Sequence, residues 1–286
     1  MSEPRYPCVH VAVPVTESDV VSSVLWDAGA TGLEERDATT MDAAAGDGVT
    51  LVAHFDEEAD ALDAVALVTA RFDGRFVPTV EHIVGDDWRE RWKAFFHTTR
   101  VGERLVVRPS WETHDAREGD LVIVLDPGQA FGTGTHETTR LVMRELEARV
   151  SGGEHVLDVG CGSGILGIAA LKLGAARVVA VDVDPIAVRV TDENAEINGV
   201  AVEASTTPVE DVPGRYPIVL ANIRSPILIP MTESLVAHLT PGGVLVLSGL
   251  LAEEESEIRA VYDAHLRFDG VRRDGDWIAL AYRSEE

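Results

Sequence analysis

The sequence predicts an α/β protein, with a doubly wound, mainly parallel sheet in its larger C-terminal part and a smaller α+β domain before it. Three observations lead to this fold class. From residue 154 onward, short apolar segments alternate with amphipathic helical patterns, which is typical of a sheet covered on both faces. A glycine-rich turn follows the first of these apolar segments. Residues 9–83 contain a strand, helix and strand pattern twice.

The N-terminal repeat has the pattern of a ferredoxin-like domain. Val9, Val11 and Val13 alternate with other residues, as the buried face of a strand does. An apolar helix face and a short strand follow, and the second copy runs from VTLVAHF to RFVPTVEHI. This βαββαβ order predicts a ferredoxin-like domain over 1–84. Pro78 places the last strand at an edge of the sheet or marks a bulge.

Residues 85–104 are expected to form a helical linker. Trp88, Trp92 and Phe95 recur at helical spacing among charged residues, which predicts a short helix that joins two domains. A ligand-binding aromatic surface is the alternative interpretation. The second domain then spans 105–286.

The C-terminal domain is predicted element by element from its apolar periodicity and its turn residues. The segments LVVRPSW and LVIVLDP are expected to be strands that lead into the next glycine-rich loop. The later strands are expected at 155–160, 176–184, 218–223, 244–249, 266–272 and 277–282, and the helices at 165–173, 185–198, 226–239 and 253–265.

Composition excludes some classes of function. The 286 residues carry a formal net charge of -25, so direct nucleic acid binding is not expected, because phosphate contacts need clustered Lys and Arg. The charge would suit a basic partner, and a solvated surface adapted to salt explains it equally. The two cysteines, Cys8 and Cys161, lie far apart, so neither a disulfide framework nor a metal site is expected. With no signal peptide pattern and no long apolar run, the chain is expected to be cytoplasmic and not in a membrane.

The turn VLDVGCGSGILG indicates a cofactor that contains adenosine. Gly160 and Gly162 follow a buried strand directly and precede a helix, where the backbone can approach a ligand closely. Asp182 lies at the end of the next strand, where a carboxylate can accept hydrogen bonds from both hydroxyls of a ribose. The GxGxxG spacing also fits NAD, and a purely structural turn is a third interpretation. Asp158, which gives the turn a DxGxGxG form, favours S-adenosylmethionine.

A second glycine-rich loop, DPGQAFGTGTHETT, begins at Asp126 and lacks the lysine of a phosphate-binding loop. At this point the sequence resembles the PrmA-type methyltransferases, which trimethylate amino groups of a large-subunit ribosomal protein at the base of the ribosomal stalk. The motifs that carry the resemblance are this loop, WRERWKAFFHTTRVGERLVVRPSW, VLDVGCGSGILGIAALKLGA, AVDVDPIAV, NAEINGV, ANI and GDWIALAYR.

The resemblance implies a Rossmann-like class I methyltransferase sheet that binds S-adenosylmethionine. Motif by motif, it implies cofactor contacts at Thr139, Gly160, Asp182 and Asn222, and Gly162 of the same turn is added to this set. The alternatives are an ordinary hydroxyl at a helix start for Thr139 and a strand-end cap for Asn222. No general base is assigned. Asn222 is a candidate for orienting the acceptor amine, and His136 is a candidate proton acceptor or a residue that structures its loop.

The resemblance further implies methyl transfer to lysine or N-terminal amines of a basic ribosomal protein. Residues 1–87 hold 18 acidic residues and four arginines, so this part is expected to recognise the substrate. Arg224, Ser225 and Pro226 depart from the usual family sequence after Asn222. Three alternatives stay open: a related methyltransferase for another protein, an NAD-dependent oxidoreductase and a noncatalytic binding module. A monomer is one option for an oligomeric state that the sequence leaves open.

Overall fold

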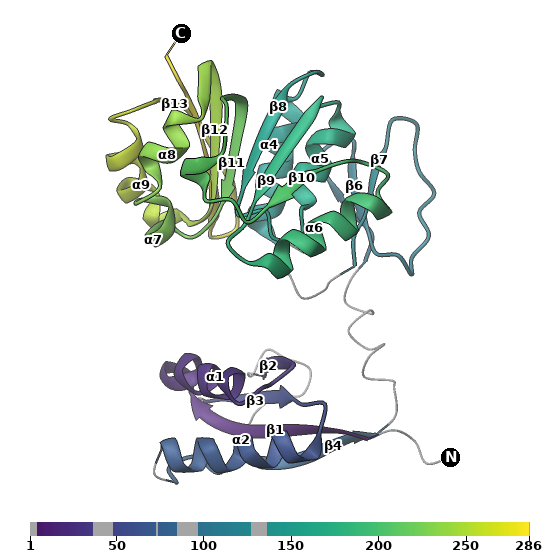
Figure 1. The fold of residues 1–286 in the computed structure, drawn as a ribbon, viewed down its shortest axis with the longest axis vertical. Helices are drawn as coiled ribbons and strands as arrows, with labels where there is room; N and C mark the ends of the chain where they lie inside the picture. Colours follow the sequence, from purple (N-terminus) through teal and green to yellow (C-terminus); the bar gives the residue numbers. More distant parts are fainter. Residues whose placement is uncertain (1–4, 37–47, 73, 85–96, 127–135, 286) are drawn as a thin grey trace. The chain divides into compact units, whose positions relative to one another are not determined.

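The computed structural model describes residues 5–36, 48–72, 74–84, 97–126 and 136–285, and the chain forms two compact units, Met1–Phe95 and Phe96–Glu286 (Figure 1). The aromatic residues 88–96 that are expected to form a connecting helix, and the glycine-rich loop 127–135, lie outside the described residues.

The N-terminal unit has the predicted βαββαβ order. Its elements are β1 (Arg5–Pro14), a 3-10 turn η1 (Val15–Glu17), α1 (Ser18–Asp27), β2 (Gly32–Arg36), β3 (Gly48–His54), α2 (Glu58–Arg71) and β4 (Thr79–Val84). The strand order is β2-β3-β1-β4, with antiparallel neighbours throughout. β4 directly follows Pro78 and lies at the edge of the sheet, which agrees with the prediction. Val9, Val11 and Val13 pack with α1 and α2 in one core.

The C-terminal unit contains a seven-stranded sheet and a smaller three-stranded one. The small sheet has the order β5-β6-β7, from β5 (Thr99–Val101), β6 (Leu105–Arg108) and β7 (Leu121–Val124). The large sheet has the order β10-β9-β8-β11-β12-β14-β13. Its strands are β8 (His155–Val159), β9 (Arg177–Val181), β10 (Glu203–Ser205), β11 (Tyr216–Asn222), β12 (Leu239–Leu251), β13 (Arg267–Asp274) and β14 (Trp277–Arg283).

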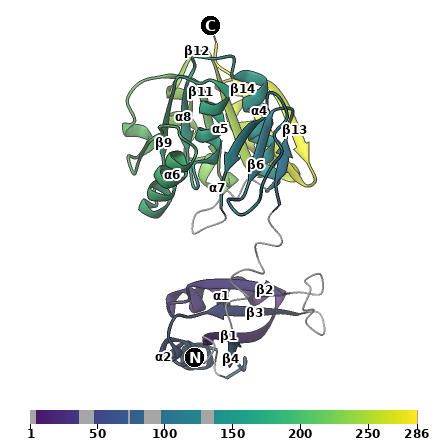
Figure 2. The same cartoon turned by 90° about the vertical axis from the view of Figure 1, so that its right-hand side faces the viewer.

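Alternate residues of the large sheet face two different cores, which makes the fold doubly wound. Val156 and Leu220 pack in one core with the small sheet and helices α4 and α5, whereas Leu157 and Val219 pack in the other with α8 and α9. Figures 1 and 2 show the helices on both sides of the sheet. The helices are α4 (Glu137–Arg149), α5 (Ile165–Leu173), α6 (Pro185–Ile197), α7 (Ser225–Leu228), α8 (Thr232–Ala237) and α9 (Glu255–Tyr262), with 3-10 turns η3 (Val209–Asp211) and η4 (Ala252–Glu254).

The sheet has parallel strands from β10 to β12 and an antiparallel strand, β14, beside them. The strand order reverses between β8 and β11, so the carboxyl ends of these two strands form the position where open α/β sheets bind ligands. The doubly wound sheet and the ferredoxin-like domain are therefore both as the sequence predicts.

Two helical predictions differ from the structure. The helical linker expected over 85–104 is wrong over 99–101, because these residues form the strand β5 and pair with β6. The single helix expected over 226–239 is wrong, because the structure has α7 and α8 separated by a turn that contains Pro230. Proline has no N–H to donate and its ring clashes with the preceding turn of a helix. The following strand, β12, begins at Leu239, ahead of the expected start at Val244.

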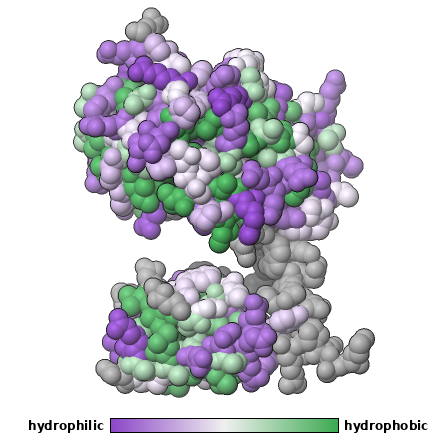
Figure 3. Space-filling view, viewed as in Figure 1, coloured by the Kyte–Doolittle hydropathy of each residue, from purple (hydrophilic) through white to green (hydrophobic). Residues whose placement is uncertain are grey.

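The described residues contain no helix that is long and apolar enough to cross a membrane. The face of the C-terminal unit drawn in Figure 3 mixes hydrophilic and hydrophobic residues. Among the same described residues, no cluster of three or more His, Cys, Asp or Glu side chains could hold a metal ion.

Candidate cofactor site

A cavity of about 590 Å³ lies where the carboxyl ends of β8, β9 and β11 meet. The five residues expected to bind the cofactor all line it: Thr139, Gly160, Gly162, Asp182 and Asn222. The sequence separates these residues by as much as 83 positions, and the parallel sheet brings them together. The rest of the wall is mostly apolar, with a further polar contribution from the segment that follows β10.

The glycine turn after β8 is tied to the end of β9 by backbone hydrogen bonds. The amides of Gly160 and Cys161 both donate to the carbonyl oxygen of Val181, at 2.8 and 3.1 Å. Gly160 has a φ of +72°, and a Cβ placed there would lie 2.8 Å from Cδ1 of Ile223. Glycine is therefore required both by the left-handed backbone and by the side chain opposite.

Asp182 is held as an acceptor at the end of β9. Its Oδ2 accepts a hydrogen bond from the amide of Gly162 at 2.9 Å, and its Oδ1 accepts one from the amide of Asp184 at 3.0 Å. A carboxylate has about four acceptor positions, so Asp182 retains capacity for two hydroxyl donors. Next to it, the Val183 side chain is 93% exposed and lines the cavity, which suits an apolar ring stacked beside a ribose.

Three buried polar oxygens of this region make no hydrogen bond with the described residues: Oγ1 of Thr139, Oδ1 of Asp158 and Oδ1 of Asn222. A buried polar atom without a partner costs about 1–3 kcal/mol. Thr139 and Asn222 line the cavity, and Asp158 lies beneath the glycine turn, where its Oδ2 accepts from the amide of Gly167 at 3.1 Å. Thr139 and Asn222 thus present two such atoms at the wall of one cavity, which indicates a polar ligand whose groups would satisfy them.

The glycines of the turn divide between the cavity and the protein interior. Gly160 and Gly162 line the cavity. A Cβ at Gly164 would meet Thr191 at 2.7 Å, and one at Gly167 would meet Val178 at 2.9 Å. The last two glycines therefore allow α5 to pack closely against α6 and β9, and the GxGxxG spacing reflects packing as much as ligand contact.

Burial governs the two ionisable groups of the turn. Burial raises the pKa of Asp158 to about 7, opposed by the Gly167 hydrogen bond, and the nearby Asp182 charge raises it further. Burial likewise raises the pKa of the Cys161 thiol to about 12. Cys161 therefore stays a neutral thiol at the cavity wall and supplies no nucleophile.

The pKa of Asp158 leads to a prediction about stability. A carboxyl whose pKa is 3.8 in the unfolded chain and about 7 in the fold loses its proton first in the unfolded chain, so the free energy of unfolding falls as the pH rises through this window and is constant above it. Asp158→Asn removes this dependence. Relative to the wild type, the free energy of unfolding of the variant should rise by about 3 kcal/mol between pH 5 and pH 8. Urea unfolding at each pH measures this difference. An unchanged difference over this range would show that Asp158 is ionised throughout.

Of the two remaining candidates, Arg224 lines the cavity and His136 does not. His136 precedes α4 and caps it, because its Nδ1 accepts from the amide of Thr138 at 3.3 Å. Its ring lies edge-on to Trp277 at 4.9 Å, and it is absent from the cavity wall, so its position favours a structural role over proton transfer. Arg224 is exposed at the cavity wall, and its side chain makes no hydrogen bond or ion pair with the described residues.

Three residues that support the site were not singled out in the sequence. Ser248 and Gly249 of β12 lie against Ile223: the Ile223 amide donates to the Ser248 carbonyl at 3.0 Å, and a Cβ at Gly249 would lie 2.8 Å from the Ile223 backbone. Glu254 accepts a hydrogen bond from the Ser225 hydroxyl. The SG pair in VLVLSG is the one local signal, since glycine inside a strand often marks a close backbone approach.

Comparisons with known proteins agree with this geometry. Residues 6–285 match the family described as Ribosomal protein L11 methyltransferase (PrmA). The protein of that name from Geobacter metallireducens is 49% identical over 208 residues, which cover 72% of this chain and 69% of that one. The one from Pelobacter propionicus is 40% identical over 295 aligned residues and 95% of each chain.

A solved structure extends the likeness to three dimensions. The ribosomal protein L11 methylase from Lactobacillus delbrueckii subsp. bulgaricus is 34% identical, with a TM-score of 0.63 over 67% of this chain and 100% of that one. The family match decides between the two cofactors that the glycine spacing left open, in favour of S-adenosylmethionine over NAD. The chain belongs to the ribosomal protein L11 methyltransferase family, and this membership confirms the predicted methyltransferase activity and its cofactor.

Proposed function

We propose that the protein transfers methyl groups from S-adenosylmethionine to lysine or N-terminal amines of ribosomal protein L11. The observation that carries the proposal is the cavity at the carboxyl ends of β8, β9 and β11, which gathers Thr139, Asp182 and Asn222 around one volume. The names of the relatives specify ribosomal protein L11, and the choice of amine is our inference.

Each part of the cavity suits one part of the cofactor. Asp182 would accept hydrogen bonds from the ribose hydroxyls. The adenine would then lie beside Val183 and Val209, on the side of β10. The methionine end would lie toward Thr139, whose unpaired Oγ1 and position in the first turn of α4 suit a carboxylate near the positive end of a helix.

When bound, the cofactor supplies a methyl group on a sulfonium, which is already activated for attack by a nucleophile. The task left to the protein is to position the amine, which contributes up to about 7–11 kcal/mol in favourable cases. The unpaired Oδ1 of Asn222 can accept an N–H of the amine and direct the nitrogen lone pair toward the methyl group. Burial of the amine lowers its pKa and favours the uncharged, nucleophilic form. No residue is assigned as a general base.

The N-terminal unit is proposed as the part that recognises the substrate, with 85–104 as the connection and 105–286 as the catalytic domain. The last part of this connection contains β5, which pairs with β6 in the small sheet of the C-terminal unit. The excess of acidic residues in the N-terminal unit, 18 against four arginines in residues 1–87, is complementary to a basic protein. We further propose that the enzyme acts as a monomer in the cytoplasm and contacts its substrate protein without binding nucleic acid directly.

The test is an incubation with S-adenosylmethionine and purified L11 from the same organism, followed by intact-mass and peptide mass spectrometry. We expect the L11 mass to rise in whole methyl increments that map to lysine side chains and the N-terminus. Asp182→Ala is the control and should lose the increments when S-adenosylmethionine is held near the wild-type Kd. If the wild type binds S-adenosylmethionine but leaves L11 unmodified, the acceptor is wrong, and Arg224→Ala becomes the variant for testing other acceptor proteins.

A further inference from the structure

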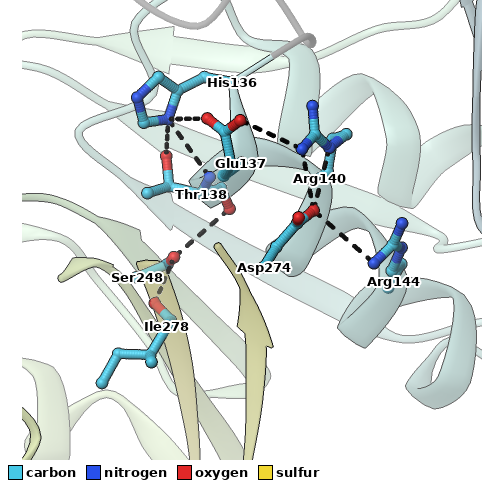
Figure 4. Close-up of polar contacts among 8 residues, drawn as sticks. All are labelled: His136, Glu137, Thr138, Arg140, Arg144, Ser248, Asp274 and Ile278. Carbon is cyan, nitrogen blue, oxygen red and sulfur yellow. Dashed lines mark hydrogen bonds and ion pairs between the residues drawn. The ribbon is translucent and has the colours of Figure 1, made fainter. Parts of the chain in front are cut away.

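The turn that joins β13 to β14, residues 274–277, contacts structure on both sides of the cavity. Its first residue, Asp274, lies between the side chains of Arg140 and Arg144 of α4 (Figure 4). The backbone carbonyl of its third residue, Asp276, accepts a hydrogen bond from η4, which follows β12. None of its residues lines the cavity wall, so any effect on the reaction must pass through other residues.

On the α4 side, two residues at the β13–β14 connection, Asp274 and Trp277, contact the start of the helix. Asp274 Oδ2 accepts hydrogen bonds from Nε and Nη2 of Arg140 at 3.1 and 3.0 Å. Trp277 packs against the ring of His136, the residue that caps α4. Thr139 lies directly before Arg140; it is fully buried, it lines the cavity, and its Oγ1 makes no hydrogen bond with the described residues. The position of this hydroxyl therefore depends on both contacts.

On the other side, the turn is connected to the segment that follows Asn222. The Asp276 carbonyl accepts a hydrogen bond from the amide of Ala252 in η4 at 2.8 Å. In the same 3-10 turn, Glu254 accepts from the hydroxyl of Ser225, three residues after Asn222, and from the amide of Leu251 at 2.7 Å. This segment is therefore anchored to the β13–β14 turn through η4.

The buried Ser248 makes a second connection between the same two sides. It is paired with Asn222 in the β11–β12 register, and its hydroxyl lies 3.0 Å from the Ile278 carbonyl and 3.4 Å from the Thr138 carbonyl (Figure 4). β11, β14 and the start of α4 thus meet at one side chain.

We propose that Asp274 is a positioning residue that sets where the Thr139 hydroxyl stands relative to Asn222, and thereby holds the methionine end of S-adenosylmethionine. The inference deepens the proposed function and rests on it. In the first turn of α4, Arg140 is the residue whose side chain reaches β13. Its ion pair with Asp274 fixes the position of α4 along the helix axis and its rotation about that axis.

The chain contains a matched control at the other end of the same helix. Asp269 of β13 accepts a hydrogen bond from Nη1 of Arg149 of α4 at 2.8 Å and lies 3.4 Å from Nη2 of Arg283. The side chains of Asp269 and Asp274 are 23% and 25% exposed, and each faces two guanidinium groups. The two pairs are alike in chemistry, but the Arg149 pair lies at the end of α4 that is remote from Thr139.

The experiment compares Asp274→Asn with Asp269→Asn in the full chain, with binding of S-adenosylhomocysteine measured by calorimetry and Tm by thermal unfolding. Both substitutions should lower Tm by similar amounts. Asp274→Asn should weaken binding about fivefold or more, equivalent to about 1 kcal/mol, and Asp269→Asn should leave it within about twofold of the wild type. Asp274→Glu, which keeps a charge for Arg140, should recover at least part of the affinity.

The outcomes separate this proposal from the function on which it rests. Equal binding by Asp274→Asn and the wild type overturns the positioning role, and so does an equal loss in Asp269→Asn, which would reflect general destabilisation. A failure of Asp274→Glu to recover any affinity also counts against it. A wild-type protein that binds no S-adenosylhomocysteine refutes the proposed cofactor site itself.

Discussion

Asp182→Ala is expected to weaken binding of S-adenosylmethionine by about 3 kcal/mol, or roughly 100-fold in Kd. The side chain would lose two hydrogen bonds from ribose hydroxyls to a carboxylate, and such charge-assisted bonds contribute about 1.5–3 kcal/mol each. The loss also leaves the Gly162 amide without its acceptor at 2.9 Å, so the glycine turn keeps only its backbone hydrogen bonds to Val181 at the end of β9. Calorimetric titration with S-adenosylhomocysteine measures the effect directly.

Asp184→Ala is the matched control for this variant. Asp184 lies two residues later and caps α6, since its Oδ1 accepts from the amide of Ile186 at 2.8 Å. Loss of a helix cap costs about 1 kcal/mol of stability, but Asp184 is absent from the cavity wall. We expect a lower Tm with an unchanged Kd. A similar Kd for Asp182→Ala and the wild type would show that the ribose does not bind at Asp182.

Gly249→Ala should have the largest effect on stability and activity together. Gly249 has a φ of +82°, and a Cβ there would lie 2.8 Å from the carbonyl carbon and oxygen of Ile223. A left-handed non-glycine residue costs about 1–2 kcal/mol, and overpacking adds about 1–3 kcal/mol. We therefore expect a loss of about 3 kcal/mol in urea unfolding. Because Asn222 adjoins the displaced backbone, methyl transfer should fall roughly 100-fold.

Gly199→Ala separates the two causes. Gly199 also has a positive φ, +66°, but a Cβ there meets no atom within 4 Å. The free energy of unfolding of this variant should fall only by the cost of the left-handed backbone conformation, and its methyl transfer should be unchanged. Equal losses of stability and activity in both variants would show that the contact with Ile223 has no role.

The sequence predicts the part of the site that depends on neighbouring residues in the chain, which is the glycine turn and the acid after the next strand. A strand that delivers Gly160 and Gly162 into a helix, with an acid after the next strand, has one common geometry in open α/β sheets. The structure places these residues and Asp182 on one cavity, as expected. The alternation of apolar segments predicts the two-sided sheet because each face needs its own core.

The supporting contacts could not be predicted in this way, because they join segments that are remote in the sequence. Arg140 and Asp274 are 134 residues apart, and nothing local to either residue indicates the other. Gly249 is required by the backbone of Ile223, which directly follows the neighbouring strand β11. The broken helix at Pro230 is a different case, because proline is a local signal for a helix break, although the apolar periodicity on either side of it predicts one continuous helix.

The outermost strands of the large sheet bear on how the protein behaves at high concentration. An unprotected strand edge offers free backbone groups to another chain and promotes aggregation. At one edge, β10 is only three residues long. At the other, β13 carries charged side chains at Arg267, Asp269, Arg272, Arg273 and Asp274, and several of them are ion-paired with α4. The charged side chains of β13 that form ion pairs with α4 therefore also disfavour pairing of this edge strand with a strand of another molecule.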